Sequence, residues 1–374
     1  MKAFLRRLIA LTNKEFRQMA RDPSSIAIGF VLPLVLILIF GYGLSLDVNH
    51  VPIAVVTERH SALSRDILAG LLGSPYFSPR WLSSMHEAEE LMRQRKVDAI
   101  LHLGSDFDKK LKYGSATAQV ILHGVDSTTA TMAGQYISGA VSEYTQKMLA
   151  RTGRDSMSGS SVRIQGRIWF NEAVTSTWYL VPGLIVIIMT LVGAFLTSLI
   201  MAREWERGTL ESIFVTPAGR TEILLAKIIP YFFLGMIGLA LCLAASRWLF
   251  HVPTRGSLSI LLLSSALYLV VALGLGLVIS SSTRSQFMAC QISIIVSFLP
   301  TIILSGFLFD LRSIPAGARI IGNILPATHY MNILKTLFLA GDNMTIVLKG
   351  CAALTGYVIL FMTIAMRLTR KKLD

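Results

Sequence analysis

The stretch AVTSTWYLVPGLIVIIMTLVGAFLTSLIMA, residues 173–202, contains no charged side chain. A helix needs about 20 apolar residues to cross the roughly 30 Å of hydrocarbon in a bilayer, so this run is long enough to span a membrane. Strands of a membrane barrel would instead be short and alternate apolar with polar residues. Because a helix pairs its own backbone groups inside hydrocarbon, the run predicts a transmembrane α-helix.

Five more charge-free runs have the same character and occupy residues 23–46, 228–246, 256–283, 285–309 and 350–366. The whole chain is 53% hydrophobic and 15% charged, which is far from the composition of a soluble protein. We therefore predict a polytopic α-helical membrane protein with six transmembrane helices, at residues 23–46, 178–202, 223–250, 257–281, 286–309 and 347–367.

Basic side chains are concentrated at both ends of the chain. Before the first span they stand at Lys2, Arg6, Arg7, Lys14, Arg17 and Arg21, and after the last at Arg367, Arg370, Lys371 and Lys372. Cytoplasmic segments are enriched in Lys and Arg, so we expect both termini in the cytoplasm. Residues 1–22 also show helical apolar spacing, which predicts an amphipathic cytoplasmic helix on the membrane surface, and residues 368–374 form a basic cytoplasmic tail.

Residues 47–177 carry 14 basic and 13 acidic side chains, and this near balance is typical of a long segment outside the cytoplasm. Short apolar runs predict strands, and amphipathic runs predict helices between them. We expect an α/β extracytoplasmic domain between the first and second transmembrane helices, with strands at 53–57, 99–102 and 118–122, and helices at 61–72, 86–93, 107–111 and 129–150.

The segment 310–346 is apolar but is interrupted at Ile314-Pro315 and Leu325-Pro326. Proline ends or kinks a helix, so one straight span is not expected here. A seventh span is the alternative, but it would place the basic C-terminus outside, against the charge rule. We predict outer-leaflet or re-entrant helices over 310–346.

Several chemistries leave no signature in the sequence. There is no GxxxxGK[ST] phosphate loop, and the longest expected cytoplasmic loop, about 202–222, is too short for an ATPase domain. The six charge-free runs also lack His, which disfavours coupling to protons or sodium ions. The seven histidines lack metal-ligand spacing, and no GxSxG motif occurs. We expect no catalytic residue, metal or cofactor in this chain. We expect no nucleic acid as a partner either, because the basic clusters adjoin membrane spans.

The segment that follows the second span, 203–222, places alternating charges around a single tryptophan. Such a helix end can dock a partner through ion pairs and an aromatic anchor. The alternative is an ordinary solvated helix end with pairs such as Glu204 with Arg207. The candidate contact residues are Arg203, Glu204, Trp205, Glu206, Arg207, Gly208, Thr209, Glu211, Thr216 and Pro217.

The order of one span, a large outside domain and five further spans resembles the type-2 ATP-binding-cassette export permeases of bacteria, particularly drug-efflux half-transporters. The motifs that carry this resemblance are Lys14-Glu15, Arg21-Asp22-Pro23, Arg203-Glu204 through Gly208-Thr209-Leu210-Glu211, Thr216-Pro217, Lys227, and Leu304-Ser305-Gly306-Phe307. In the outside domain, Gly73-Ser74-Pro75-Tyr76 and Ser105-Asp106-Phe107 are also similar, although Leu103-Gly104-Ser105 departs from the family pattern.

The resemblance implies that segment 203–222 contains a coupling helix, which rests in a cleft of a cytoplasmic ATP-binding-cassette ATPase. ATP and Mg²⁺ would then bind the partner ATPase and not this chain. Gly208 would allow a tight turn, and Thr209 would cap the next helix. The resemblance also implies a second permease subunit in a homo- or heterodimer, with a periplasmic adaptor and an outer-membrane duct as further candidate partners. It places the chain in the bacterial cell inner membrane.

Six spans are too few to line a path for a drug-sized molecule, so two such chains are expected to face each other. Small residues in the fifth span permit close helix approach and local unwinding along this path. The candidate path residues are Ser293, Ser297, Pro300, Ser305 and Gly306, for which ordinary helix packing is the alternative. The expected cargo is amphiphilic, because an amphipathic helix beside the membrane suits a cavity that takes substrate from the bilayer.

A second functional class fits part of the same pattern. In a mechanotransmission or sensor protein, the outside domain acts on a periplasmic partner and no substrate crosses the membrane. Such proteins usually have four spans, so the number of membrane helices separates this alternative from an exporter.

Overall fold

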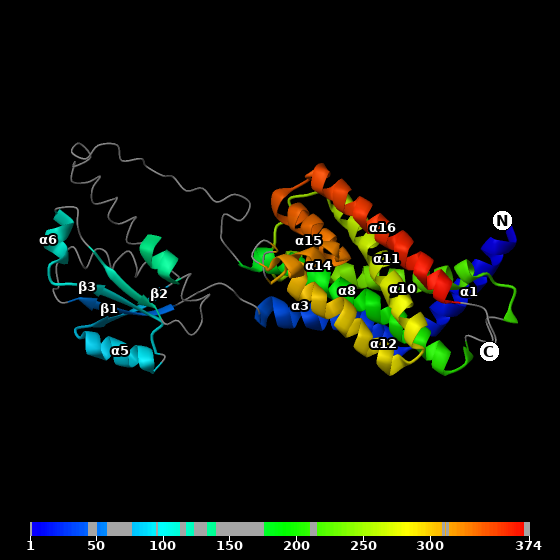
Figure 1. Cartoon of the computed structure of the whole chain (residues 1–374), viewed down its shortest axis with the longest axis horizontal. Helices are drawn as coiled ribbons and strands as arrows, with labels where there is room; N and C mark the ends of the chain where they lie inside the picture. Colours follow the sequence, from blue (N-terminus) through cyan, green and yellow to red (C-terminus); the bar gives the residue numbers. More distant parts are fainter. Residues whose placement is uncertain are drawn as a thin grey trace. The chain divides into compact units, whose positions relative to one another are not determined.

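The structure is a computed structural model. It describes residues 2–43, 51–57, 77–94, 96–112, 117–122, 133–139, 176–209, 215–308, 311 and 314–369. The chain divides into two units, a helical unit of Met1–Ser45 with Arg167–Asp374, and a sheet-containing unit of Leu46–Gly166 (Figure 1).

Six helices in the described residues are long and apolar enough to cross a membrane, which confirms the predicted number of spans. They are Pro23–Gly43 (α2 Pro23–Ile26, η1 Ala27–Val31 and α3 Leu32–Gly43), α8 Ser176–Glu206, α10 Arg220–Trp248, α11 Leu258–Thr283, Gln286–Leu304 (α12 Gln286–Ser293, η3 Ile294–Phe298 and α13 Leu299–Leu304) and α16 Met344–Leu368. The three segments labelled η are π-helical turns, the third being η4 Thr336–Ala340.

Helix α8 lies at the centre of the helical unit. In α8, 89% of the most apolar stretch is buried, against 17% in α16. Small residues explain the close packing, because a Cβ added at Gly193 would lie 2.5 Å from Cβ of Ala272 in α11. A Cβ added at Gly276 would lie 2.4 Å from the carbonyl oxygen of Ala194. Glycine at these contacts lets α8 and α11 approach to backbone distance.

Two short helices, α14 Ala316–Ile324 and α15 Pro326–Lys335, fill much of the segment between the fifth and sixth spans. Ten helical residues rise about 15 Å, half the thickness of the hydrocarbon, so neither helix can span it alone. Leu325 between them is extended, as expected for a residue before proline. The described part of this segment contains no candidate membrane span.

Helix α1, Lys2–Ala20, lies at the same end of the helical unit as the C-terminal end of α16 (Figure 1). One face of α1 packs along α10. With an even number of spans, α1 and the C-terminal end of α16 are expected at the same end of the helical unit, because the chain finishes on the side of the membrane where it began.

Within the described residues, the sheet-containing unit has four strands in the order β2-β1-β3-β4. Their bounds are β1 Val51–Thr57, β2 Phe77–Leu82, β3 Ala99–Leu103 and β4 Gln119–Leu122. The described helical segments that accompany them are α5 Met85–Arg93, α6 Phe107–Lys112 and residues 133–139. Strand β1 pairs in parallel with β2 and β3, whereas β3 and β4 are antiparallel. The sheet and its helices confirm an α/β domain between the first two spans.

Strand β2 was not predicted from the sequence. It is an edge strand with one buried residue, and it contains Pro79, so it lacks the continuous apolar run of a buried strand. Of the predicted helix 129–150, residues 133–139 are described and are helical. The predicted helix 61–72 lies outside the described residues.

Candidate functional site

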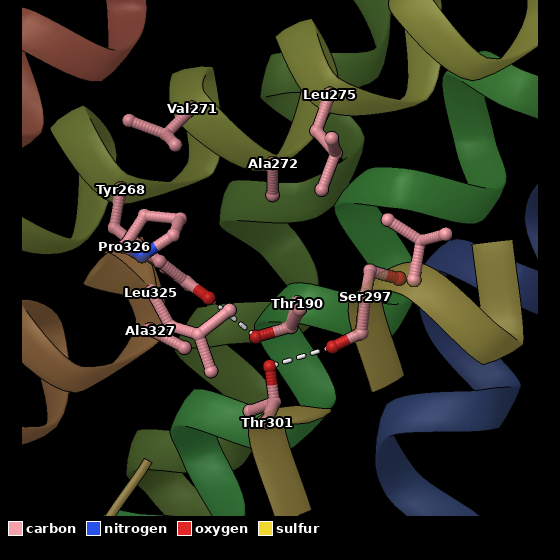
Figure 2. Close-up of a pocket in the computed structure, with 11 residues that line it drawn as sticks. Thr190, Tyr268, Val271, Ala272, Leu275, Ser297, Thr301, Leu325, Pro326 and Ala327 are labelled. Atoms are coloured by element: carbon pink, nitrogen blue, oxygen red, sulfur yellow. Dashed lines mark hydrogen bonds between the residues drawn. The ribbon is translucent and has the colours of Figure 1, made fainter. Parts of the chain in front are cut away.

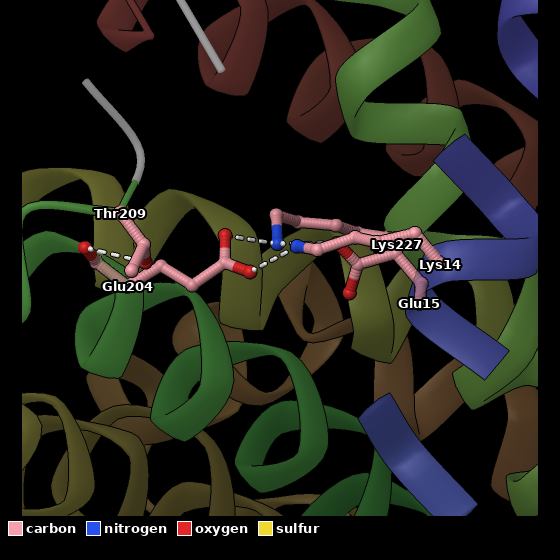
Figure 3. Close-up of polar contacts among 5 residues, drawn as sticks. All are labelled: Lys14, Glu15, Glu204, Thr209 and Lys227. Atoms are coloured by element: carbon pink, nitrogen blue, oxygen red, sulfur yellow. Dashed lines mark hydrogen bonds and ion pairs between the residues drawn. The ribbon is translucent and has the colours of Figure 1, made fainter. Parts of the chain in front are cut away.

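Four charged side chains meet where α1, the C-terminal end of α8 and the first turns of α10 come together (Figure 3). We call Lys14, Glu15, Glu204 and Lys227 the charged cluster. Lys14 Nζ lies 2.9 Å from Glu15 Oε1 and 3.0 Å from Glu204 Oε1. Lys227 Nζ lies 3.3 Å from Glu15 Oε1 and also donates to Glu204 Oε2. Each ammonium group thus contacts both carboxylates.

Three members of the charged cluster are removed from water, since Glu15, Glu204 and Lys227 are each 2% exposed. Burying an ion costs several kcal/mol unless an opposite charge compensates it. The cluster meets this condition with two positive and two negative groups. Removing one of them would leave an uncompensated charge among three helices, so the cluster fixes α1, α8 and α10 to one another.

Lys14 is the member that solvent reaches, with a side chain 43% exposed. Partial burial lowers the pKa of the Lys14 ammonium group, but the carboxylates of Glu204 and Glu15 raise it by more. The net effect is a pKa above the ordinary lysine value, so Lys14 remains charged at neutral pH.

A second set of contacts surrounds the bend between α1 and the first span. Asp22 caps α2 through bonds from the backbone nitrogen and hydroxyl of Ser25, and its carboxylate lies 2.9 Å from Nη1 of Arg203. Burial raises the pKa of Asp22, but hydrogen bonds from Ser25 and Arg203 lower it by more, so the net pKa is below the usual value. Arg203 Nε also donates to Gln286 Oε1 at 3.2 Å. The end of α8 is therefore tied to α2 and α12.

A third ion pair joins the N-terminal part of α1 to the start of α10. Arg7 Nη2 lies 2.9 Å from Glu222 Oε1, and Glu222 is buried. The same carboxylate accepts a hydrogen bond from the backbone nitrogen of Gly219 at 2.6 Å and so caps α10. Arg7 and the charged cluster therefore hold α1 against α10 at two points.

The sequence predicted that Glu204 and Trp205 lie at the surface and contact a partner, but the structure places both side chains inward. Glu204 is buried in the charged cluster, so its side chain cannot face a partner in this conformation. Trp205 is half-buried against the core, and the guanidinium of Arg284 lies 4.6 Å from the centroid of its ring. Glu204 is buried because it pairs with Lys14 and Lys227, which are on other helices.

The next residues reach the surface. Glu206 is exposed and accepts a hydrogen bond of 2.7 Å from the backbone nitrogen of Gln286, so it caps α12. Arg207 and Thr209 are exposed, and Gly208 between them has φ +67°, a left-handed conformation that glycine adopts without strain. This matches the predicted tight turn. Thr209 donates its hydroxyl to the carbonyl of Glu204 at 3.3 Å, and the helix that it was predicted to cap lies outside the described residues.

Thr216 and Pro217 are exposed just before α10. Glu211, the remaining residue of the predicted contact set, lies outside the described residues. Of the predicted contact residues that the structure describes, the exposed ones are Glu206, Arg207, Thr209, Thr216 and Pro217.

Two of the predicted path residues lie on the buried side of the fifth span. Ser293 donates to the hydroxyl of Ser198 in α8 at 2.9 Å, and Ser297 donates to the carbonyl of Ser293. Ser297 lies in the π-helical turn η3, and Pro300 follows in α13. The helix is thus locally unwound where the sequence predicted it, while Ser293 serves ordinary helix packing.

The other two predicted path residues, Ser305 and Gly306, follow the fifth span directly. Ser305 is buried, and within the described residues its hydroxyl has no hydrogen-bond partner. Gly306 has φ +84°, and its carbonyl accepts hydrogen bonds from the Tyr179 hydroxyl at 3.0 Å and from Lys335 Nζ at 2.6 Å. We call Tyr179, Gly306 and Lys335 the Gly306 site.

A small cavity lies between α8, α11, the fifth span and the start of α15 (Figure 2). Its volume is about 30 Å³, and it is lined by Thr190, Tyr268, Val271, Ala272, Leu275, Val296, Ser297, Thr301, Leu325, Pro326 and Ala327. This space holds about two water molecules, so the described helices leave no room here for a drug-sized molecule in this conformation. Of the predicted path residues, only Ser297 lines the cavity.

Comparison with known proteins identifies the family. The sequence model of the family described as ABC-2 family transporter protein matches residues 23–367. The chain belongs to the ABC-2 transporter family. It is 39% identical over 371 residues to the probable multidrug ABC transporter permease YbhS of Escherichia coli, covering 99% of this chain and 98% of YbhS. It is 29% identical to the probable multidrug ABC transporter permease YbhR of E. coli, covering 91% and 92%, and 25% identical to the E. coli inner membrane transport permease YhhJ, covering 98% of each.

This ABC-2 permease therefore is a multi-pass protein of the inner membrane, and its six spans agree with that role. The residues that sequence reasoning did not place in its site are Lys14, Glu15, Glu222 and Lys227. The sequence holds a signal for two of these residues, Glu15 and Lys227. Glu15 is the one acidic residue in an otherwise basic helix, and Lys227 stands just inside an apolar span. Charges in such positions need partners, but only the fold shows which partners they find.

Proposed function

We propose that this ABC-2 permease is the membrane half of an exporter that moves amphiphilic or drug-like substrates outward across the inner membrane. The energy is supplied by ATP and Mg²⁺ bound to a separate cytoplasmic ATPase. Both termini of the permease, and the turn after α8, lie on the cytoplasmic side. The relatives named multidrug permeases support the class of cargo.

One observation carries this proposal. A single helix, α8, runs from Tyr179 in the Gly306 site to Glu204 in the charged cluster. Beyond Glu204 lies the exposed turn around Arg207 and Thr209. Because an α-helix is stiff over this length, a push on the turn would move the whole of α8 and its contact with the fifth span. This is the connection that an exporter driven by an external ATPase requires.

A second permease subunit completes the proposed transporter. The first, fifth and sixth spans are mostly exposed in a single chain, so apolar surface remains for lipid or a second copy. The resemblance to both YbhS and YbhR of one bacterium supports a homodimer or a heterodimer equally. The extracytoplasmic domain is the proposed docking site for a periplasmic adaptor that leads to an outer-membrane duct.

The exposed turn supplies the test. Arg207→Glu reverses a surface charge, while the backbone nitrogen of Arg207, which bonds to the carbonyl of Arg203, is unchanged. We expect membrane insertion at the wild-type level, reduced co-purification of the ATPase and at least a tenfold loss of ATP-dependent uptake of a fluorescent drug by inverted vesicles. Lys349→Glu, an exposed charge reversal at the start of α16, is the matched control and should leave both unchanged.

Wild-type uptake that persists without ATP or without a bound ATPase would contradict the proposal. If the protein is instead a sensor, no uptake is expected at all. Sensor proteins of this kind usually have four spans. The six candidate spans of this chain argue against it.

A further inference from the structure

At the Gly306 site, the Lys335 ammonium group lies between a carbonyl oxygen and an aromatic ring. Lys335 Nζ lies 2.6 Å from the carbonyl oxygen of Gly306 and 3.7 Å from the centroid of the Tyr179 ring. A carbonyl oxygen and an aromatic face are the groups with which proteins bind organic cations, through a charge-assisted hydrogen bond and a cation–π contact. The hydroxyl of Tyr179 also bonds to the Gly306 carbonyl, and this bond holds the ring and the carbonyl together.

The three residues of the site come from three separate elements. Tyr179 lies in the first turn of α8, Gly306 follows α13, and Lys335 is the last residue of α15. The segment after Gly306 is also fixed, because Phe307 is buried and its ring occupies the space that a Cβ at Gly183 of α8 would need. Tyr179 and Gly306 therefore form a rigid pair, whereas Lys335 reaches this pair by a flexible four-carbon stem.

Among the described residues, the side chains of the site are partly exposed. Tyr179, Gly306 and Lys335 are each half-buried, not enclosed. They join the second span to the end of the fifth, so separating these spans at this end must break the contacts of Lys335 or move them with one span.

We propose that the Tyr179–Gly306 pair is a binding site for the organic ammonium group of a cationic amphiphile, and that Lys335 is its tethered occupant when cargo is absent. A cationic cargo displaces the Lys335 ammonium group and releases the third element, α15, from the pair. Neutral cargo has no such group and does not compete with Lys335. This inference rests on the proposed export function, which it extends to a class of substrate.

The test measures binding without transport, on the purified complex in lipid nanodiscs without ATP. The probes are dodecylammonium, whose N–H groups can donate to the Gly306 carbonyl, and its uncharged analogue of equal chain length, dodecan-1-ol, both measured by equilibrium dialysis. In Lys335→Met the ammonium competitor is absent, so we expect the half-saturating concentration of the cationic probe to fall about 3- to 10-fold. The uncharged probe should bind as before. Lys349→Met removes an exposed lysine elsewhere and should change neither probe.

Two substitutions at Tyr179 make the test independent of Lys335. Tyr179→Phe keeps the aromatic face and should retain binding of the cationic probe, whereas Tyr179→Leu removes the face and should weaken it several-fold. Equal shifts for both probes, or the same shift in Lys349→Met, would overturn the proposal. Failure of ATP-dependent uptake by the wild type, with binding as expected, would instead contradict the export function.

Discussion

The two ends of α8 are held in different ways. At the charged cluster, Glu204 is enclosed by full opposite charges from α1 and α10, with three of the four side chains buried. At the Gly306 site, the described contacts of the half-buried Lys335 ammonium group include a carbonyl oxygen and an aromatic ring. In the charged cluster, a neutral group in place of one charge would leave a buried ion uncompensated. At the Gly306 site, by our proposal, the ammonium group of a ligand can replace that of Lys335.

This difference indicates a division of labour along one helix. Breaking the charged cluster leaves a buried charge without compensation, so this end is expected to move as a unit with α1 and α10. Breaking the Gly306 site exposes groups that water or a ligand can satisfy, so separation there costs less. An exporter of the proposed kind needs a stiff end where force enters and an end that opens where cargo leaves.

The largest expected effect is at the charged cluster. Lys227→Met removes the buried positive charge and leaves Glu15 and Glu204 with Lys14 alone, which should lower the free energy of unfolding by about 3–5 kcal/mol. The measurement is thermal unfolding of the purified chain in detergent. Lys349→Met is the matched control on the surface.

A second variant shows whether charge balance is the cause. Lys227→Met combined with Glu204→Gln removes one charge of each sign and leaves Lys14 with Glu15, so most of the lost stability should return. A double variant as unstable as the single one would show that packing of the lysine stem, and not compensation, holds this end.

A smaller effect is expected at the other end of α8. A Cβ at Gly183 would lie 2.3 Å from Cδ2 of Phe307, so Gly183→Val must displace Phe307 and the neighbouring Gly306. Overpacking of this kind costs about 1–3 kcal/mol. Hydrogen exchange should increase around residues 176–183 and 301–308 but not around the charged cluster. Gly356→Val is the control, because a Cβ there would meet no atom within 4 Å from elsewhere in the described part of the chain. Increased exchange at both ends would abolish the contrast between them.

The smallest effect concerns pH at the bend before the first span. Because the folded pKa of Asp22 is below the ordinary aspartate value of 3.8, its charge stabilises the fold above that pH, and this contribution is lost as the pH falls through the lower, folded pKa. Asp22→Asn keeps an N-cap but loses the charge, so we expect a destabilisation of about 1 kcal/mol or less at pH 7. The difference from wild type in thermal unfolding should vanish in acid. A difference that persists there would show that the ion pair with Arg203 is not responsible.

Much of the fold follows from local sequence properties. The number of spans and the α/β character of the outside domain could be predicted, because a charge-free run of sufficient length has one stable form in hydrocarbon. The edge strand β2 could not, since an edge strand needs no continuous apolar run. The turn at Gly208 was predictable because few other residues adopt its backbone conformation.

The site itself divides in the same way. The sequence indicated that residues 203–217 matter, and it placed Arg207, Thr209, Thr216 and Pro217 where the structure exposes them. It also suggested that Glu204 faces a partner, which the structure does not support. Lys14 and Glu204 are separated by 190 positions, and Lys227 and Glu15 by 212, so no local pattern pairs them.

By itself, the sequence determined that this protein crosses the membrane six times and carries a charged turn after its second span, because apolar length and charge are properties of short segments. Only the tertiary structure decided which charges of that turn are buried and which are exposed. It also decided that one helix joins the charged cluster to the Gly306 site. The physical reason is that compensation of a buried charge depends on distance in space, and helix packing sets this distance between residues that are remote in the chain.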